Sequence, residues 1–221
     1  REKDGAPAMP NTQIADIAGG SYPAVINILL ALREVEKTGQ GKFLDISMTD
    51  NLFPFMWMAL GLTAKNYYAE GGDLQLTGAS PRYGIYETLN KGYIALGALE
   101  EKFWLRFCEV INLPQEFIDD RINPNATKVA IIKLIKEKET EYWKETLSKE
   151  DNICCSIVSS LKEAMSNAQI IERELLTAEI KLGTEKILAI PTLLAPTWKT
   201  KDVIKSAPKL GEANLLYMEE T

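Results

Sequence analysis

One long apolar stretch, Ile14 to Gly39, constrains this chain more than any other feature of its sequence. From Pro23 onward, apolar side chains occupy most of the circumference of a predicted helix, which is typical of a helix packed inside a protein core. Ser21 fits a helix cap, Pro23 suits a first helical turn, and Gly39 suits a left-handed residue after the last turn. We therefore predict a core helix that begins near Ser21 and ends before Gly39.

Asp16 lies just ahead of this predicted start, and Gly19 and Gly20 follow it. The free N–H groups and the positive dipole end of a helix favour a nearby anion, so we expect the Asp16 side chain to be an ionised carboxylate. The two glycines lack a Cβ atom, so a substrate can approach their backbone and their N–H groups can donate to an oxyanion. These residues fit a reaction site. They also fit a structural alternative, in which Asp16 caps the helix and the glycines form a turn.

Charge and composition exclude several classes of function. The net charge is −6 and the lysines are scattered among glutamates, whereas a nucleic-acid-binding face would need clustered basic residues. The longest apolar runs are interrupted by Pro54 or by charges, and no secretory signal opens the chain, so we expect no membrane span and a cytoplasmic location. The first residue is Arg1 rather than Met, which suggests a fragment of a longer protein.

Histidine is absent, and this restricts the chemistry of the chain. Serine-hydrolase triads, cysteine–histidine pairs and most transition-metal sites need a histidine, so acid–base work must fall to carboxylates, lysines or tyrosines. The three cysteines, of which Cys154 and Cys155 are adjacent, have the spacing of neither a disulfide framework nor a zinc site. We expect no metal site, and we interpret the thiols as small buried hydrophobes.

The order of predicted elements indicates an α/β protein. A short run at 42–47 resembles a strand that follows the first helix, and a second helix, rich in aromatic residues and methionine, is predicted at 49–70. The glycine-rich stretch 71–81 is the best candidate for a domain boundary. Beyond it, 83–88 and 93–97 form a predicted hairpin.

A second acidic residue, Glu100, follows the predicted hairpin at a strand-to-helix junction. The apolar spacing after it predicts a helix, and two charged amphipathic helices are predicted between 125 and 149. The remaining expectations are a strand at 152–158, short helices at 160–165 and 168–175, and a strand or extended chain at 179–190.

Four stretches carry a resemblance to a known family. They are IADIAGGSYPAVINILLALREVEKTGQGKFLDISMTD at 14–50, LTGASPRYGIYET at 76–88, GYIALGALEEKFW at 92–104 and CCSIVSSLKEAM at 154–165. In this order, and together with KLGE near the end, they resemble the family III CoA-transferases, and within them the branch that includes 2-methylacyl-CoA racemase.

The resemblance implies a fold and an assembly. Residues 1–75 would form the C-terminal part of a nucleotide-binding-like large domain that binds CoA, 76–190 a smaller α+β domain, and 191–221 a segment that returns to the large domain. The family forms interlocked homodimers. CoA is implied as part of an acyl-CoA substrate, with no further cofactor. The family's racemases also use a histidine upstream of the reactive aspartate, before the position of Arg1.

The resemblance also implies roles for single residues. Asp16 matches the family's reactive aspartate, and Glu100, in GALEEKFW, matches the glutamate that supports acid–base work in the racemases. The glycine N–H groups would steady a thioester enolate, and Arg82 would meet a phosphate or carboxylate of the ligand. The expected substrate-binding residues are Gly19, Gly20, Arg82 and Tyr83.

Three functions are open at this point. The first is racemase-like proton transfer α to a CoA thioester, which the GALEEKFW stretch favours, as does GASP at 78–81 in place of the glycine run of oxalate-type transferases. The second is CoA transfer from an acyl-CoA to a free carboxylate, with Asp16 as nucleophile. The third is a non-catalytic fragment or interaction module. For Glu100 itself, a purely structural role as a helix cap is also open.

Overall fold

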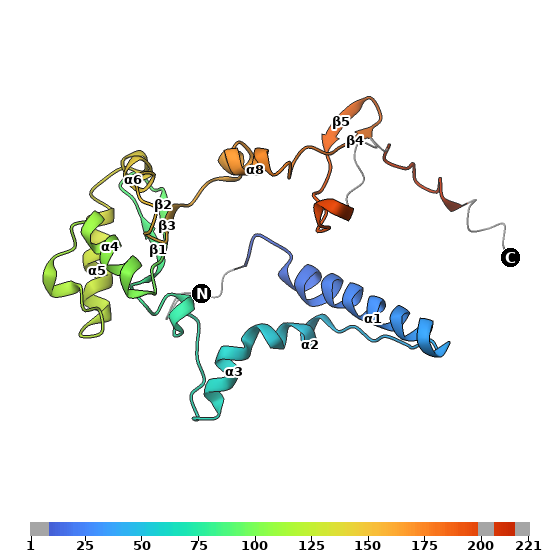
Figure 1. Ribbon diagram of the computed structural model, residues 1–221, viewed down its shortest axis with the longest axis horizontal. Helices are drawn as coiled ribbons and strands as arrows, with labels where there is room; N and C mark the ends of the chain where they lie inside the picture. The colour runs from blue at the N-terminus through green and yellow to red at the C-terminus, as the bar shows by residue number, and fades with distance from the viewer. Residues whose placement is uncertain (1–8, 199–205, 215–221) are drawn as a thin grey trace. The chain divides into compact units, whose positions relative to one another are not determined.

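The computed structural model describes residues 9–198 and 206–214, and contacts divide the chain into two compact units, Arg1–Val158 and Ser159–Thr221 (Figure 1). Within the first unit, a run of helices at 15–63 precedes an α/β body at 75–158. The finer division at 75/76 and 190/191 stays a prediction, and its outermost residues, 1–8 and 215–221, lie outside the described part of the chain.

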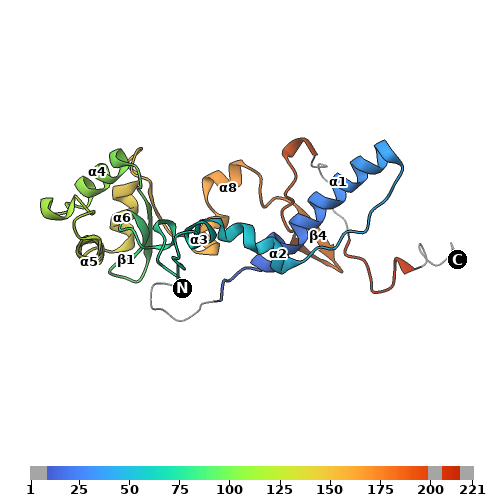
Figure 2. The same ribbon diagram turned by 90° about the horizontal axis from the view of Figure 1, so that it is seen from below.

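A continuous helix occupies the start of the described chain (Figure 2). It comprises the π-helix η1, Ala15–Ser21, and the α-helix α1, Tyr22–Thr38, and it ends as predicted at Gly39, whose φ of 70° is left-handed. The α-helical part begins at Tyr22, as predicted near Ser21, but Ser21 has helical backbone angles and makes no side-chain capping bond, because η1 extends the helix back to Ala15. Asp16 consequently lies in the first turn of the helix rather than ahead of it.

The π-helical segment has a local cause in the sequence. Pro23 has no N–H group, so it leaves the carbonyl of Gly19, four residues earlier, without its α-helical donor. The side chain of Asn51 supplies a donor instead, with Nδ2 at 3.0 Å from the Gly19 oxygen. Just before the proline the helix has the wider π turn, in which the Tyr22 N–H donates to the Ile17 carbonyl.

The apolar helix α1 is exposed, and the prediction of a buried core helix is wrong for the described chain. No residue of α1 is buried, and Leu29, Leu30 and Ile26 expose 61, 60 and 57% of their surface. The element that α1 chiefly contacts is η1, its own continuation. Apolar periodicity indicates only that a helix is suited to burial. It does not supply the packing partner that would bury it.

The same helix corrects the prediction about membrane spans. Residues 15–38 form one helix that is long and apolar enough to cross a membrane, so the expectation that no run reaches that length is wrong. This finding rests on length and composition, which core helices of soluble proteins also satisfy.

The chain after Gly39 departs from two further predictions. Residues 42–47 form no strand, and none of the described strands offers them a partner for backbone hydrogen bonds. The predicted second helix is divided into α2 (Met48–Leu52), the 3-10 turn η2 (Phe53–Met56) and α3 (Trp57–Thr63). Pro54 accounts for the interruption, because it has no N–H for a helical hydrogen bond. Ser47 caps α2, with Oγ accepting from the Asp50 N–H at 3.3 Å.

A three-stranded antiparallel sheet forms the centre of the α/β body. Its strands are β1 (Tyr83–Glu87), β2 (Tyr93–Gly97) and β3 (Cys155–Ile157), in that spatial order. The predicted hairpin is confirmed, with Tyr83 opposite Gly97. The predicted strand near 152–158 is confirmed as β3, whose Ser156 lies opposite Ala95 of β2.

Three helices pack with this sheet around one apolar core (Figure 1). They are α4 (Glu101–Val110), α5 (Pro124–Ile135) and α6 (Thr140–Leu147), with the short turns η3 (Gln75–Thr77) and η4 (Gln115–Phe117). All three helices agree with the predicted ones. Tyr86 and Ile94 of the sheet meet Trp104 and Phe107 of α4 in the core, where each exposes 1% of its surface or less.

The second unit is made of short elements. They are α7 (Leu161–Met165), α8 (Ala168–Glu172), the hairpin of β4 (Glu179–Leu182) and β5 (Glu185–Leu188), and the turn η5 (Pro196–Trp198). Ser160 and Glu163 form a reciprocal capping box at the start of α7. The β4–β5 turn uses Gly183 at a φ of 64°. The predicted short helices are confirmed, whereas the single strand or extended chain predicted at 179–190 is a hairpin of two antiparallel strands.

Candidate active site

Asp16 presents an exposed carboxylate from the first turn of η1. Among the described residues this carboxylate makes no hydrogen bond or ion pair, while the backbone carbonyl of Asp16 accepts from Ser21 Oγ at 3.1 Å. The first turn lies at the positive end of the helix dipole, and π-helical segments are frequent at functional sites. The carboxylate is therefore available for chemistry.

Gly19 and Gly20 serve packing in this structure. Their N–H groups lie inside η1, where each N–H is directed along the helix toward an earlier carbonyl, so the predicted donation to an oxyanion does not fit this conformation. A Cβ atom on Gly19 would stand 2.7 Å from the Met48 carbonyl oxygen, and one on Gly20 would stand 3.2 Å from Met48 Cγ. The missing side chains thus let α2 approach η1 closely.

Glu100 presents the second available carboxylate, directly before α4. Its extended backbone (φ −73°, ψ 139°) places it at the cap position, and its carbonyl accepts from the N–H groups of Phe103 and Trp104 at 3.1 and 3.0 Å. Its exposed side chain makes no capping bond. The structural alternative, in which the Glu100 side chain caps α4, does not match this geometry.

Arg82 is held inside the α/β body. Its Nε and Nη2 atoms donate to Asp120 Oδ1 at 3.0 and 2.7 Å, and Nη1 donates to Glu101 Oε2 at 2.7 Å. The guanidinium carbon lies 4.9 Å from the centre of the Trp104 ring, and the residue exposes 8% of its surface. Burial by itself lowers the pKa of Arg82, but the hydrogen bonds to Asp120 and Glu101 outweigh burial and raise it. Nε, Nη1 and Nη2 of Arg82 thus each have an internal partner, and the predicted contact between Arg82 and a ligand phosphate or carboxylate stays a prediction.

Tyr83 is the first residue of β1, and its side chain is on the face of the β1–β2 hairpin opposite the buried Tyr86. It exposes 37% of its surface, and its ring lies 3.8 Å from the position of a Cβ atom on Gly97, the residue opposite it. Gly97 lies three positions before Glu100, so Tyr83 and Glu100 belong to the same end of the hairpin. Its assignment to substrate binding stays a prediction.

The structure therefore groups the predicted residues in two sets. Arg82, Tyr83 and Glu100 belong to the α/β body, whereas Asp16 and the glycine pair belong to η1, and no hydrogen bond or ion pair among the described residues joins the sets. Their catalytic and binding roles stay predictions.

Sequence reasoning missed the partners of these residues. Asp120 lies 38 positions from Arg82, and Asn51 lies 32 positions from Gly19. Separations of this size leave no periodic or motif signal, so only the fold could identify these contacts.

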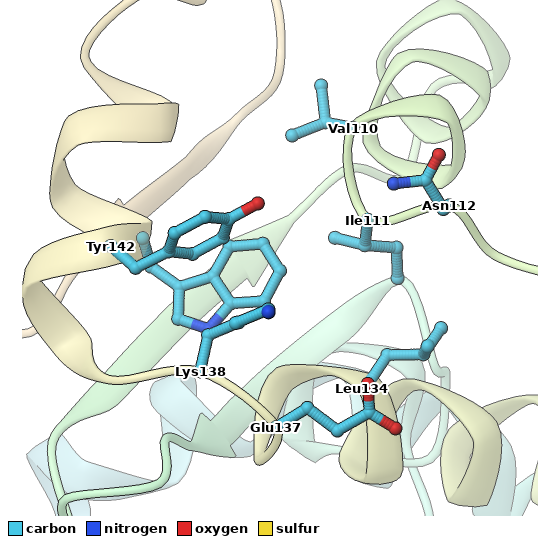
Figure 3. Close-up of a pocket in the computed structure, with 8 residues that line it drawn as sticks. Val110, Ile111, Asn112, Leu134, Glu137, Lys138 and Tyr142 are labelled. Carbon is cyan, nitrogen blue, oxygen red and sulfur yellow. The ribbon is translucent and has the colours of Figure 1, made fainter.

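A small hollow in the body lies apart from all these residues. Figure 3 shows its lining, in which Ile111 and Leu134 are apolar and Glu137 and Lys138 supply charges. Trp143 also lines this hollow. Neither Asp16 nor Glu100 lines it, and the part of the chain that the structure describes contains no cluster of side chains suited to a metal ion. The free carboxylates, rather than this hollow, mark the candidate site.

Comparison with known proteins gives a consistent family and fold. The sequence pattern of CoA-transferase family III matches residues 1–214. Alpha-methylacyl-CoA racemase of Mus musculus is 27% identical over 97% of this chain and 56% of its own length. Succinyl-CoA:glutarate CoA-transferase of Mus musculus is 26% identical over 99% of this chain and 51% of its own length. The chain thus spans about half the length of these curated relatives.

Solved structures show the same fold. Rv3272 from M. tuberculosis in its orthorhombic form has a TM-score of 0.74 at 19% identity, over 97% of this chain and 58% of its own. A CAIB/BAIF family protein from Brucella suis has a TM-score of 0.72 at 17% identity, over 100% of this chain and 58% of its own. The α/β class predicted from the sequence is confirmed.

Proposed function

The chain belongs to CoA-transferase family III, and on that premise we propose that it is part of an acyl-CoA racemase-like enzyme, which moves the proton α to a CoA thioester. Relatives in this family include both racemases and CoA-transferases, as their names state. The acyl-CoA would be the substrate and the source of CoA. Homodimer formation and a cytoplasmic location stay parts of the proposal.

One observation carries the proposal: Asp16 and Glu100 are exposed carboxylates at helix starts, and neither has a partner among the described residues. A general base must be free to accept a proton, and a carboxylate held by a cation or by capping N–H groups is less basic. Asp16 would take the α-proton from one face of the substrate, and Glu100 would support proton return.

Two other glutamates of α4, Glu101 and Glu109, differ from Glu100 because each is bound to an arginine. Glu101 is bound to Arg82 at 2.7 Å, and Glu109 is bound to Arg106 at 2.9 Å. Both carboxylates are more than half exposed, so exposure alone does not leave a carboxylate free. Glu100 differs from them because no cation lies within bonding distance of it among the described residues.

CoA transfer is the second candidate. The glutarate CoA-transferase of mouse covers 99% of this chain, which favours this candidate as a genuine alternative. In that reaction the Asp16 carboxylate would attack the thioester carbonyl, which breaks the C–S bond, releases CoA as its thiolate and leaves a mixed anhydride on Asp16. The thiolate would then attack the Asp16 carbonyl and release the first acid as a carboxylate. The acceptor carboxylate would displace CoA from Asp16 to form a second anhydride, and the released thiolate would attack its acyl carbonyl, which gives the new thioester and frees Asp16. Asp16 would then act as a nucleophile, and Glu100 would not be required.

Proton exchange provides the decisive test. A 2-methylacyl-CoA is incubated with the chain in D₂O, and loss of the α-proton signal is followed by NMR. The variants are Asp16→Asn and Glu100→Gln, and Glu109→Gln is the matched control on the same helix. We expect exchange with the parent chain and with Glu109→Gln, and a loss of about 100-fold in each of the other two variants, typical of removing a general acid or base.

Other outcomes separate the alternatives. A covalent adduct at Asp16 that hydroxylamine traps, without α-proton exchange, would support CoA transfer instead. No exchange, no adduct and no CoA binding by calorimetry would overturn both enzymatic proposals and support a non-catalytic segment.

A further inference from the structure

We propose that Arg82 is a positioning residue, which holds the turn carrying Glu100 by binding both of its sequence neighbours. This inference rests on the proposed role of Glu100. Arg82 Nη1 donates to Glu101 Oε2 at 2.7 Å and to the Leu99 carbonyl at 3.4 Å. Residues 98–101 are here called the Glu100 turn. A single nitrogen thus binds the residue before Glu100 and the residue after it.

The other edge of the guanidinium is fixed from the opposite direction. Asp120 Oδ1 accepts from both Nε and Nη2, and the guanidinium carbon lies over the Trp104 ring, 4.9 Å from its centre. Both ion-pair side chains, Arg82 and Asp120, expose 10% of their surface. The guanidinium is planar and rigid, so fixing one edge determines where Nη1 points. Arg82 can therefore act as a fixed support for the Glu100 turn.

The turn is arranged so that its neighbours are bound while the central carboxylate stays free. The Glu100 carbonyl accepts from Phe103 and Trp104, which fixes its C-terminal side, whereas the Leu99 carbonyl is bound by Arg82. The Glu100 side chain makes no capping bond. The backbone that carries this carboxylate is consequently held in one orientation, and catalysis depends strongly on such orientation.

The first test measures the turn itself and requires no activity. Amide hydrogen exchange is followed by NMR for the parent chain, Glu101→Ala, Glu101→Gln and the matched ion-pair control Glu109→Ala. Glutamine keeps an oxygen that can accept from Arg82, whereas alanine does not. We expect about tenfold faster exchange of the Phe103 and Trp104 amides in Glu101→Ala, and near-parent exchange in the other two variants.

The Ile111 amide, which donates to the Phe107 carbonyl at 3.0 Å, reports on the far end of the same helix. Its exchange should be unchanged in every variant. Parent-like protection of Phe103 and Trp104 in Glu101→Ala would overturn the proposal, as would equal loosening by alanine and glutamine. Arg82→Lys, which keeps a charge but not the rigid fork, should loosen the same two amides.

The second test measures α-proton exchange of a 2-methylacyl-CoA. Glu101→Ala should lower kcat about tenfold with KM unchanged, and Glu101→Gln should restore the parent rate. A purely structural role would leave the rate per folded molecule unchanged and would contradict the proposal. If Glu100→Gln has no effect on exchange, the proposed role of Glu100 fails, and the amide measurements still decide whether Arg82 holds the turn.

Discussion

Asn51 donates through its side-chain Nδ2 to the carbonyl oxygen of Gly19 at 3.0 Å and so joins α2 to η1. The carbonyl lacks its usual donor because Pro23 stands four residues later. The glycine at position 19 also lets the Met48 carbonyl come close, since a Cβ atom would lie 2.7 Å from it. The segment that carries Asp16 is thus tied to α2 by a contact that depends on glycine.

The two glycines should respond differently to alanine. Gly19→Ala forces backbone atoms apart, and we expect it to destabilise the η1–α2 contact by about 1–2 kcal/mol. In Gly20→Ala the new Cβ atom meets the Met48 side chain, which is flexible and can move aside. The higher helix propensity of alanine should therefore outweigh this contact and stabilise η1 by up to about 1 kcal/mol. Amide exchange of Asn51 measures both effects, and equal effects of the same sign would contradict this account.

Removal of Asp120 should destabilise the α/β body strongly. Asp120→Ala leaves the buried guanidinium of Arg82 without two of its hydrogen bonds, which should cost about 3 kcal/mol. The control is the adjacent Asp119→Ala, because Asp119 binds the exposed Arg121 and should have no measurable effect. Urea unfolding followed by Trp fluorescence measures the difference, and similar losses from both variants would refute the prediction.

Asn90 should stabilise the start of α6 from the β1–β2 turn. Its Oδ1 accepts from the Thr140 backbone N–H at 2.9 Å and from Thr140 Oγ at 2.6 Å. Asn90 thus acts as the cap of α6, because the side chain of Glu139, at the cap position, makes no capping bond. Asn90→Ala should lower the free energy of unfolding by about 1 kcal/mol, whereas Asn90→Asp keeps the acceptor and most of the stability. Chemical denaturation compares the two, and equal losses would show that the acceptor is unimportant.

The Arg106–Glu150 pair should make stability depend on pH. Arg106 Nε and Nη2 bind the two carboxylate oxygens of Glu150 at 2.7 Å each, and these hydrogen bonds lower the pKa of Glu150 below its ordinary value of 4.5. A carboxyl whose pKa is lowered by folding contributes stability that is fully present above pH 4.5 and is lost as the pH falls through the folded-state pKa. The unfolding free energy of the parent chain should therefore fall more steeply on acidification than that of Glu150→Gln. Parallel pH curves would contradict this assignment.

The three thiols should differ in reactivity. Burial raises the pKa of Cys108 and of Cys155 to about 12, whereas Cys154 is exposed. A thiol-specific disulfide reagent at pH 8 should therefore react rapidly with one thiol per chain, and Cys154→Ser should abolish that phase. Rapid reaction in the Cys154→Ser variant would show that a buried thiol is accessible. The expectation of small buried thiols is confirmed for Cys108 but wrong for Cys154.

Short-range patterns predicted much of the α/β body correctly. Alternating apolar residues and a turn between them located the β1–β2 hairpin, and helical periodicity located α4 to α6. The requirement for glycine at position 92 could not be predicted from the neighbouring residues, because it arises from α6: a Cβ atom there would clash with the side chain of Thr140. The pattern identified the hairpin, and the packing of α6 explains the glycine.

Predictions failed where an element depends on a distant partner. The run at 42–47 has strand-like residues but no neighbouring strand, and α1 has core-like residues but no cover among the described residues. The internal partner of Arg82 was likewise not foreseen, because Asp120 is 38 positions away, and the ligand-binding role of Arg82 stays a prediction. Glu100 lies directly before a helix as predicted, whereas Asp16 lies within the first turn of a helix rather than ahead of it, and only the fold shows that neither carboxylate has a partner among the described residues.

The sequence by itself determined the family, the α/β class, the elements of the body and the two acidic residues to consider. It could do so because motifs and periodicity depend on residues that are close together in the sequence. Tertiary structure decided which charged groups are neutralised and which stay free. Glu100 and Glu101 are adjacent in sequence, yet one is unpaired and the other is bound to Arg82. A hydrogen bond requires two groups within about 3 Å, and only folding brings distant residues that close.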